Sequence, residues 1–165
     1  MSPRTGAGDV RQPPRGALRR GYSGQIPNQG QTAEGQLSLA WQAVPKSVAE
    51  ARRAVGDFAE AAGLDTSTLA ALRVAVSEAV TNAVVHAYLD EPEAGPVHVT
   101  AERTDDSMWV VVSDEGRGMI PRPDSPGIGL GLPLIARMTQ GFELHERDGG
   151  GTVLRMRFRV SGGRP

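Results

Sequence analysis

Two polar side chains, Glu78 and Asn82, lie within the otherwise apolar stretch VSEAVTNAVVHAY, which spans residues 76–88. Their spacing of four residues places them on one face of a helix, about one turn apart. An amide oxygen such as that of Asn82 is a hard ligand that suits Mg²⁺. A glutamate one turn earlier can accept a proton from a hydroxyl beside a metal-bound phosphate. Either residue alone is more often an ordinary surface side chain, so the pair needs support from other clusters.

A second cluster follows an apolar run in VVVSDEGRGM, where Asp114 precedes Gly116 and Gly118. An aspartate at the end of a strand commonly forms only a local turn. Its carboxylate can also accept a hydrogen bond from an exocyclic amino group, such as N6 of adenine. The glycines would let a flat base approach the backbone.

A third cluster is PGIGLGLPLI, in which Gly127, Gly129 and Gly131 run directly into a predicted helix. Backbone N–H groups at such a helix start can bind phosphate. Glycine pairs are common in ordinary loops, so this cluster alone is a weak signal. It is not a Walker A loop, because no Gly-Lys-Ser/Thr follows. It is not a convincing dinucleotide fingerprint either, because the strand-to-helix unit is missing.

The elements that position these clusters follow from hydrophobic periodicity. Residues 36–44 alternate between apolar and polar side chains, which predicts a half-buried strand, and a helix is predicted over about 47–62. Asp65 or Thr66 can cap a second helix over about 67–88. Next come two strands (VHVTAER and SMWVVVSD), a loop (EGRGMIPRPDSPGIG), a helix (LGLPLIARMT) and a hairpin (FELHERDGGGTVLRMRFRV). This order predicts an α/β (α+β) two-layer sandwich, with a mixed, largely antiparallel sheet and helices on one face.

Composition divides the chain into three parts. Residues 1–35 are rich in Gly, Pro, Arg and Gln and poor in large apolar residues, which predicts a disordered basic tail. Residues 36–160 are expected to form one domain, and 161–165 a flexible C-terminus. The absence of cysteine excludes disulfides and thiolate metal sites and suits a reducing compartment. The three histidines show no paired spacing for zinc.

Charge and hydropathy exclude several classes of partner. A formal net charge of −1 disfavours direct binding to nucleic acid. No run approaches the roughly 18 apolar residues of a membrane span, and the N-terminus lacks the apolar core of a signal peptide. These features predict a soluble cytoplasmic protein without membrane contact.

Taken in this order, the three clusters and Gly151-Thr152 of the last hairpin resemble the Bergerat-type ATPases. Gyrase, the Hsp90 chaperone, sensor histidine kinases and the mismatch-repair ATPase share this family. The resemblance covers roughly residues 36–160. It implies that nucleotide is bound by the N-box residue Asn82, by Asp114, Gly116 and Gly118, by Gly127, Gly129, Gly131 and Leu132, and by Thr152.

Within that family, SEAVTNAVVHAY and GIGLGLPLIARM look most like the serine-protein kinase anti-sigma factors of Gram-positive bacteria. This resemblance implies Mg-ATP as cofactor, a serine on an anti-anti-sigma (STAS-type) protein as phosphoacceptor, and sequestration of an alternative sigma factor. It also implies a homodimer. Glu78 would be the general base, Asn82 the Mg²⁺ ligand and Asp114 the residue that selects adenine.

Some features leave alternatives open. Only MIPRPDSP separates Gly118 from Gly127, and Arg122 is the sole cation of this short lid. A nucleotide-gated binding module without phosphotransfer, or a weak ATPase, therefore remains an alternative to the kinase. Arg52 or Arg53 lies near the place where the resemblance puts a catalytic arginine. His86, one turn beyond Asn82, is predicted to pack within the helix layer rather than to face the site.

Overall fold

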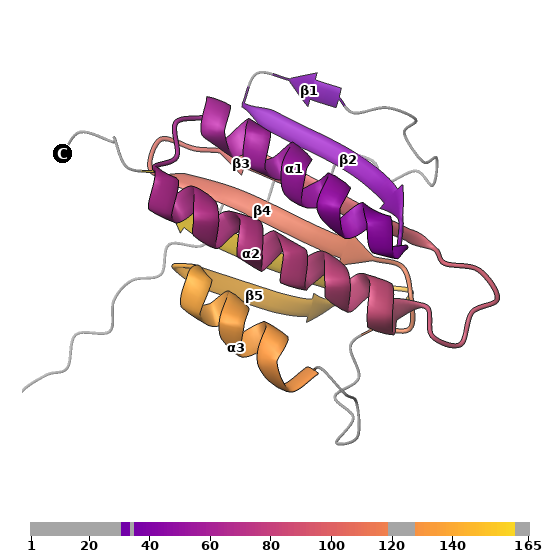
Figure 1. The fold of residues 1–165 in the computed structure, drawn as a ribbon. Coiled ribbons are helices and arrows are strands. Elements are labelled where there is room, and N and C mark those ends of the chain that lie inside the picture. Colours follow the sequence, from indigo (N-terminus) through magenta and orange to yellow (C-terminus); the bar gives the residue numbers. More distant parts are fainter. Residues whose placement is uncertain (1–30, 34, 119–127, 161–165) are drawn as a thin grey trace, which may run out of the picture.

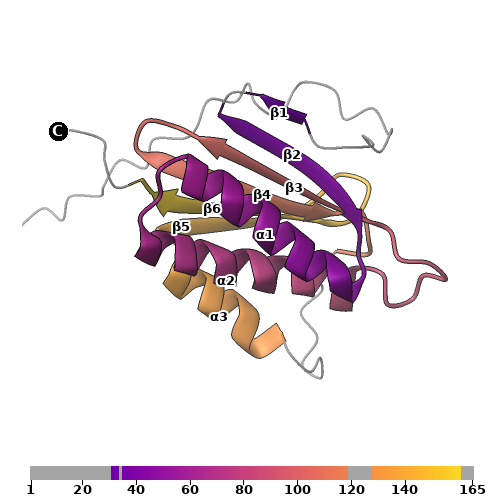
Figure 2. The same ribbon diagram turned by 45° about the horizontal axis from the view of Figure 1, so that its top comes forward.

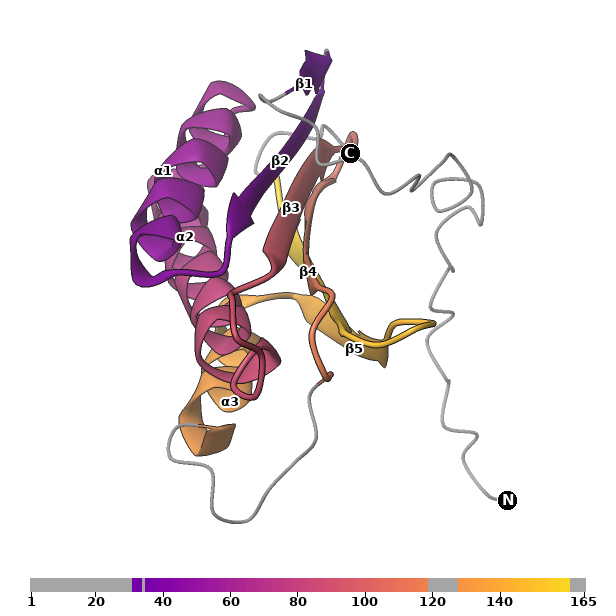
Figure 3. The same ribbon diagram turned by 90° about the vertical axis from the view of Figure 1, so that its right-hand side faces the viewer.

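The computed structural model describes residues 31–33, 35–118 and 128–160. This part of the chain forms two layers, a six-stranded sheet and a layer of helices on one of its faces (Figures 1 and 3). Along the chain the elements are β1 (Gln31–Ala33), β2 (Gln36–Gln42), α1 (Pro45–Ala61), α2 (Thr66–Asn82), the π-helix η1 (Ala83–Ala87), β3 (Pro96–Arg103), β4 (Ser107–Asp114), α3 (Ile128–Met138), β5 (Gly141–Glu146) and β6 (Thr152–Arg159). The predicted two-layer fold class is confirmed.

The strand order is β1-β2-β3-β4-β6-β5, and Figure 2 shows β6 between β4 and β5. All pairings of the described strands are antiparallel, so the expected mixed character of the sheet is wrong for them. Alternating apolar residues set the register, because a slip of one residue would turn every core side chain outward. Val99 lies opposite Val112, and Val112 lies opposite Leu154 on its other side.

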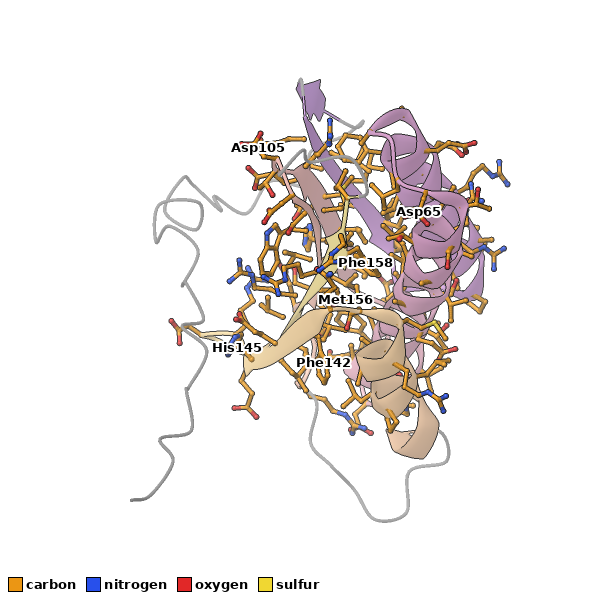
Figure 4. The ribbon with its side chains drawn as sticks, turned by 90° about the vertical axis from the view of Figure 1, so that its left-hand side faces the viewer. Asp65, Asp105, Phe142, His145, Met156 and Phe158 are labelled. Carbon is orange, nitrogen blue, oxygen red and sulfur yellow. The ribbon has the colours of Figure 1, made fainter. Side chains whose placement is uncertain are left out.

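The core lies between the inner face of the sheet and the helices. Met156 and Phe158 of β6 are fully buried, and Figure 4 shows both between the sheet and the helix layer. Ala75, Ala79 and Ala83 are also buried. These small side chains let the α2–η1 helix lie close to the sheet, as expected for packing against a flat surface.

Local capping explains where the first two helices begin. α1 starts at Pro45, two residues before the predicted start, at a position where proline loses no helical hydrogen bond. Asp65 is the N-cap of α2, because its Oδ1 accepts hydrogen bonds from the backbone N–H groups of Ser67 and Thr68, each at 3.0 Å. Thr66 is therefore the first residue of the helix rather than its cap.

The edge strand β1 lies within the stretch that the sequence predicts to be a disordered tail. β1 pairs with β2, with Thr32 opposite Leu37, although the sequence pattern assigns residues 1–35 to a tail. A strand of three residues is too short to show an alternating pattern. Residues 1–30 and 34 of the predicted tail, and the predicted flexible C-terminus, residues 161–165, lie outside the described residues.

The continuous helix formed by α2 and η1 is more apolar than was expected from the sequence. The helix Thr66–Ala87 has 22 residues, and a window of 18 of them has a mean hydropathy of 1.3, enough by length and composition to cross a membrane. The expectation that no such run exists is therefore wrong. In the fold this helix contacts α1, α3, β4 and β6 (Figure 1), and Leu72, Val76 and Val80 are fully buried. Apolar core helices share this composition, and these contacts make it one of them.

Candidate functional site

A pocket opens where the C-terminal end of α2 and the π-helix η1 face the ends of β4 and β6. Its empty volume is about 370 Å³, open mouth included. The lining residues are Ala79 and Asn82 of α2, Ala83, His86 and Ala87 of η1, Val112 and Asp114 of β4, Thr152 and Leu154 of β6, and Gly118. Residues from the predicted N-box, the first glycine box and the last hairpin thus meet in one place.

Asp114 is the buried acid of this pocket, with 6% of its surface exposed. Its Oδ1 accepts hydrogen bonds from the backbone N–H groups of Gly116 at 3.1 Å and Thr152 at 3.2 Å. Burial raises the pKa of Asp114, and these bonds together with the Thr152 side chain oppose the rise only partly. A carboxylate has about four acceptor sites, so the group keeps capacity for a donor on a ligand.

The glycines of this region permit close approach between backbone segments. A Cβ placed on Gly116 would lie 2.1 Å from the carbonyl oxygen of Ala87. A Cβ on Gly151, which has a φ of +100°, would lie 2.1 Å from the carbonyl oxygen of Asp114. The loop after β4 is therefore pressed against η1 on one side and the β5–β6 turn on the other. The sequence assigned this freedom to an approaching base, whereas the structure uses it first for the protein's own backbone.

We expect Gly116→Ala to lower the free energy of unfolding by about 2 kcal/mol or more, because backbone atoms cannot yield to a Cβ at that distance. Urea unfolding followed by tryptophan fluorescence measures the change. Gly141→Ala is the matched control, since a Cβ there meets nothing within 4 Å. Equal stability of the two variants would contradict the close packing of Gly116 on η1.

Arg117 ties the end of η1 to the loop after β4, a role that the sequence analysis did not predict. Its backbone N–H donates to the carbonyl of Ala87 at 3.0 Å, and its Nε donates to the carbonyl of His86 at 3.2 Å. Its guanidinium also pairs with Asp90. These bonds satisfy carbonyls that the end of a helix leaves without partners. The only signal in the sequence is the position of Arg117 between two glycines.

Glu78 and Asn82 both face the start of α3. A Cβ placed on Gly131 would lie 3.4 Å from Glu78 Oε2 and 3.4 Å from Asn82 Oδ1. Gly131 belongs to the first turn of α3, whose N–H groups favour anions. Asn82 lines the pocket as well, whereas Glu78 does not and lies one turn further along α2. The site thus extends from Asp114, past Asn82, to Glu78.

None of the remaining predicted residues is found in the pocket lining of the described part of the chain. Gly127 and the lid with Arg122 lie outside the described residues, and Gly129 belongs to the first turn of α3. In the described part of the chain, the structure does not bring Leu132 to the pocket, because Leu132 packs half-buried against the hydrophobic core. Arg52 and Arg53 lie exposed on α1, away from the pocket lining.

His86 lies in the wall of the pocket, so the expectation that it packs within the helix layer is wrong. Burial lowers the pKa of His86, and the nearby charge of Arg117 lowers it further. The sequence predicts an α-helix to the end of this stretch, whereas residues 83–87 form a π-helix. The direction of the His86 side chain could therefore not be predicted from the sequence.

The site fits an elongated ligand that has a flat hydrogen-bond donor at one end and phosphates at the other. Asp114 can accept from the flat end, and the start of α3 can bind the phosphates. Among the described residues, no three His, Cys, Asp or Glu side chains are arranged to hold a metal. Mg²⁺ keeps several waters and binds substrate phosphates, so the single amide oxygen of Asn82 suits a metal that arrives with the ligand.

The sequence pattern of the histidine kinase-like ATPase domain matches residues 41–158. The chain belongs to this family, which confirms the Bergerat-type assignment and implies that the protein binds ATP. Among its relatives are proteins named anti-sigma F factor, as the sequence resemblance implied. That of Clostridium beijerinckii is 27% identical over 141 residues, which are 78% of this chain and 98% of the relative. That of Shouchella clausii is 30% identical over 112 residues, which are 67% and 76% of the two chains.

A solved structure shows the same fold. The structure of the RsbU and RsbW domains of Rv1364c from Mycobacterium tuberculosis superposes with a TM-score of 0.58 and 22% identity. The match covers 76% of this chain and 32% of that one. The likeness supports the two-layer architecture, and the roles of individual residues rest on the geometry above.

Proposed function

We propose that the protein is a cytoplasmic serine-protein kinase that uses Mg-ATP and acts as an anti-sigma factor. Its acceptor would be a serine of an anti-anti-sigma (STAS-type) protein, and it would also sequester an alternative sigma factor as a homodimer. Neither a membrane nor nucleic acid takes part. The observation that carries the proposal is the position of Glu78 and Asn82 against the first turn of α3, beside a pocket that contains Asp114.

Each residue then has a separate task. Asp114 accepts a hydrogen bond from the adenine amino group, with Thr152 and Gly116 holding its carboxylate in place. Asn82 would hold Mg²⁺, which neutralises phosphate charge when it is bound with the nucleotide. Glu78 accepts the proton of the attacking serine hydroxyl. Phosphoryl transfer needs mainly positioning and charge stabilisation, which such an arrangement provides.

The test is transfer of a labelled γ-phosphate from ATP to purified candidate partner proteins. The kinase proposal expects label on a serine of the partner. Free labelled phosphate without a labelled partner would favour the weak ATPase instead. Binding of ATP with neither product would favour the nucleotide-gated binding module, and either of these results would contradict the kinase.

We expect Asn82→Ala to weaken ATP binding about tenfold in the presence of Mg²⁺, and little in its absence. The reason is that the substitution removes one oxygen ligand, while alanine is well tolerated in a helix. Titration calorimetry with Mg²⁺ and with EDTA measures both values. Thr81→Ala, on the same helix but outside the pocket lining, is the control. An unchanged affinity with Mg²⁺ would remove Asn82 from the metal site.

A further inference from the structure

The hydroxyl of Tyr88 bridges two strands beside the candidate site, and the proposed mechanism does not use it. Tyr88 is the first residue after η1, and its hydroxyl donates a hydrogen bond to the carbonyl of Pro96 at 2.6 Å. The same hydroxyl accepts a bond from the backbone N–H of Glu115 at 2.9 Å. Pro96 begins β3 and Glu115 follows the last residue of β4, so one side chain connects the ends of both strands.

This bridge lies at the point where the pairing of β3 with β4 stops. The register ends with Val97 opposite Asp114, and one further step would place Pro96 opposite Glu115. The Tyr88 hydroxyl bonds a main-chain group of each of these two residues instead. A direct backbone hydrogen bond spans about 2.9 Å, whereas an inserted hydroxyl holds its two partners further apart. The chain after Asp114 is therefore directed away from β3 and toward η1.

The surroundings of Tyr88 fix its ring and keep its hydroxyl protonated. A Cβ placed on Gly95 would lie 2.3 Å from Cε1 of Tyr88, so the ring packs directly against the main chain of Gly95. Burial raises the pKa of Tyr88, the hydrogen bond from Glu115 opposes the rise in part, and the nearby charge of Asp114 adds to it. The hydroxyl thus keeps its proton at neutral pH and can donate to Pro96.

The bridge holds the peptide group that directly follows Asp114. Because a peptide group is planar, the bond to the Glu115 N–H sets the orientation of the whole plane that begins at Asp114. Gly116, whose N–H donates to the Asp114 carboxylate at 3.1 Å, is the next residue in the chain. Hydrogen bonds weaken steeply when they are misaligned. A rotation of this plane would therefore weaken a bond between Asp114 and a ligand.

We propose that Tyr88 is a positioning residue that sets the preference of the site for a base with an exocyclic amino group, by holding the peptide after Asp114. This role rests on the proposed adenine contact of Asp114. Tyr88 is not among the described residues that line the pocket, so it acts through Asp114 and does not touch the nucleotide. Without the hydroxyl, the Glu115 N–H loses its bond and the peptide plane is free to rotate.

The test compares the affinities of ADP and inosine diphosphate for the wild type and for Tyr88→Phe, which keeps the ring but removes the hydroxyl. Inosine diphosphate carries a carbonyl oxygen in place of the amino group and cannot donate from that position to Asp114. We expect the wild type to prefer ADP, and Tyr88→Phe to reduce this preference about fivefold while the Kd of inosine diphosphate changes less than about twofold. A residue that serves only the fold would raise both Kd values alike. NMR titration measures these values together with the integrity of the fold.

Two further variants separate positioning from general loosening of the sheet. Thr104→Val is the matched control, because the Thr104 hydroxyl donates to the carbonyl of Ser107 at 3.0 Å in the turn at the other end of β3 and β4. It should keep the wild-type preference for ADP. In the Asp114→Asn background, Tyr88→Phe should change the preference less than about twofold, because the group that it positions has been replaced.

An unchanged preference for ADP in Tyr88→Phe would overturn the role of Tyr88. An equal loss of affinity for both nucleotides would also overturn it, as would a loss of preference that persists in the Asp114→Asn background or appears in Thr104→Val. A wild type without any preference for ADP would show that the proposed adenine contact of Asp114 is itself wrong, and the role of Tyr88 with it. That result distinguishes a failure of the proposed site from a failure of Tyr88 alone.

Discussion

Glu78→Gln should abolish phosphoryl transfer and leave ATP binding unchanged. The amide keeps the shape of the side chain beside Gly131 but cannot accept the proton of the serine hydroxyl. Loss of a general base slows a reaction by about 100- to 10,000-fold. Binding should survive because Glu78 lies beyond the residues that line the pocket. Transfer of labelled γ-phosphate gives the rate, and titration calorimetry gives the affinity.

Two further variants complete this experiment. Glu78→Ala should show the same loss of transfer, because it also lacks a base. Glu50→Gln makes the same chemical change at an exposed position of α1 and should transfer at the wild-type rate. A native rate in Glu78→Gln would show that another group, or no group, accepts the proton.

Asp114→Asn should weaken adenine nucleotide binding by about tenfold or more without lowering stability. The wild-type Oδ1 already accepts two backbone N–H groups, from Gly116 and Thr152. An asparagine has only one oxygen, so satisfying those two donors turns its NH₂ group toward the other carboxylate position. That NH₂ group and the adenine amino group are both donors and cannot bind each other. Leaving them unpaired costs about 1–3 kcal/mol.

The raised pKa of Asp114 determines the effect on stability. The folded state holds this proton more tightly than the unfolded chain does. Asp114 therefore ionises at a lower pH in the unfolded chain than in the folded protein. The free energy of unfolding falls as the pH rises from the unfolded pKa to the folded pKa, and it stays lower above the folded pKa. Asparagine is neutral and removes this loss at neutral pH. Urea unfolding should thus show Asp114→Asn to be at least as stable as the wild type.

The control for this prediction is Asp105→Asn, in the exposed turn between β3 and β4, which precedes the start of β4, whereas Asp114 lies at its end. It should bind nucleotide as the wild type does. Equal affinity of Asp114→Asn and Asp105→Asn for ADP would remove Asp114 from the base pocket. Strong unfolding of Asp114→Asn would instead show that its oxygens serve the fold.

Most of the fold was predictable because its elements carry strong local signals. β3, β4 and β6 alternate apolar and polar residues along their length, and each lies close to its expected position. Asp65 is an ordinary N-cap, and the apolar face of α1 was visible in its spacing. β1 was missed because its three residues pair through the backbone with β2, and backbone pairing leaves no mark on composition.

The π-helix could not be predicted, because its cause is tertiary. The run from Ala83 to Ala87 has the composition of an ordinary helix. Its final carbonyls are bonded by Arg117, and Gly116 packs directly on Ala87. Both come from a loop about thirty residues later in the chain, whose approach no helical periodicity records. His86 was misplaced for the same reason.

The candidate site was predictable in its residues but not in its contacts. The spacing of Glu78 and Asn82 on one helix face is a local property, and the structure places both beside Gly131. Thr152 was expected to support the adenine site, but the sequence could not show that its backbone N–H reaches Asp114. Such contacts depend on the register of β4 against β6, which brings the end of one strand to the start of the other.

A crystal structure with Mg²⁺ and a non-hydrolysable ATP analogue would examine the arrangement as a whole. We expect the adenine amino group to donate to Asp114, Asn82 to coordinate the metal, and the phosphates to lie at the start of α3 with Glu78 beside the terminal one. A nucleotide bound outside the pocket, or a metal whose coordination omits Asn82, would contradict the proposed site.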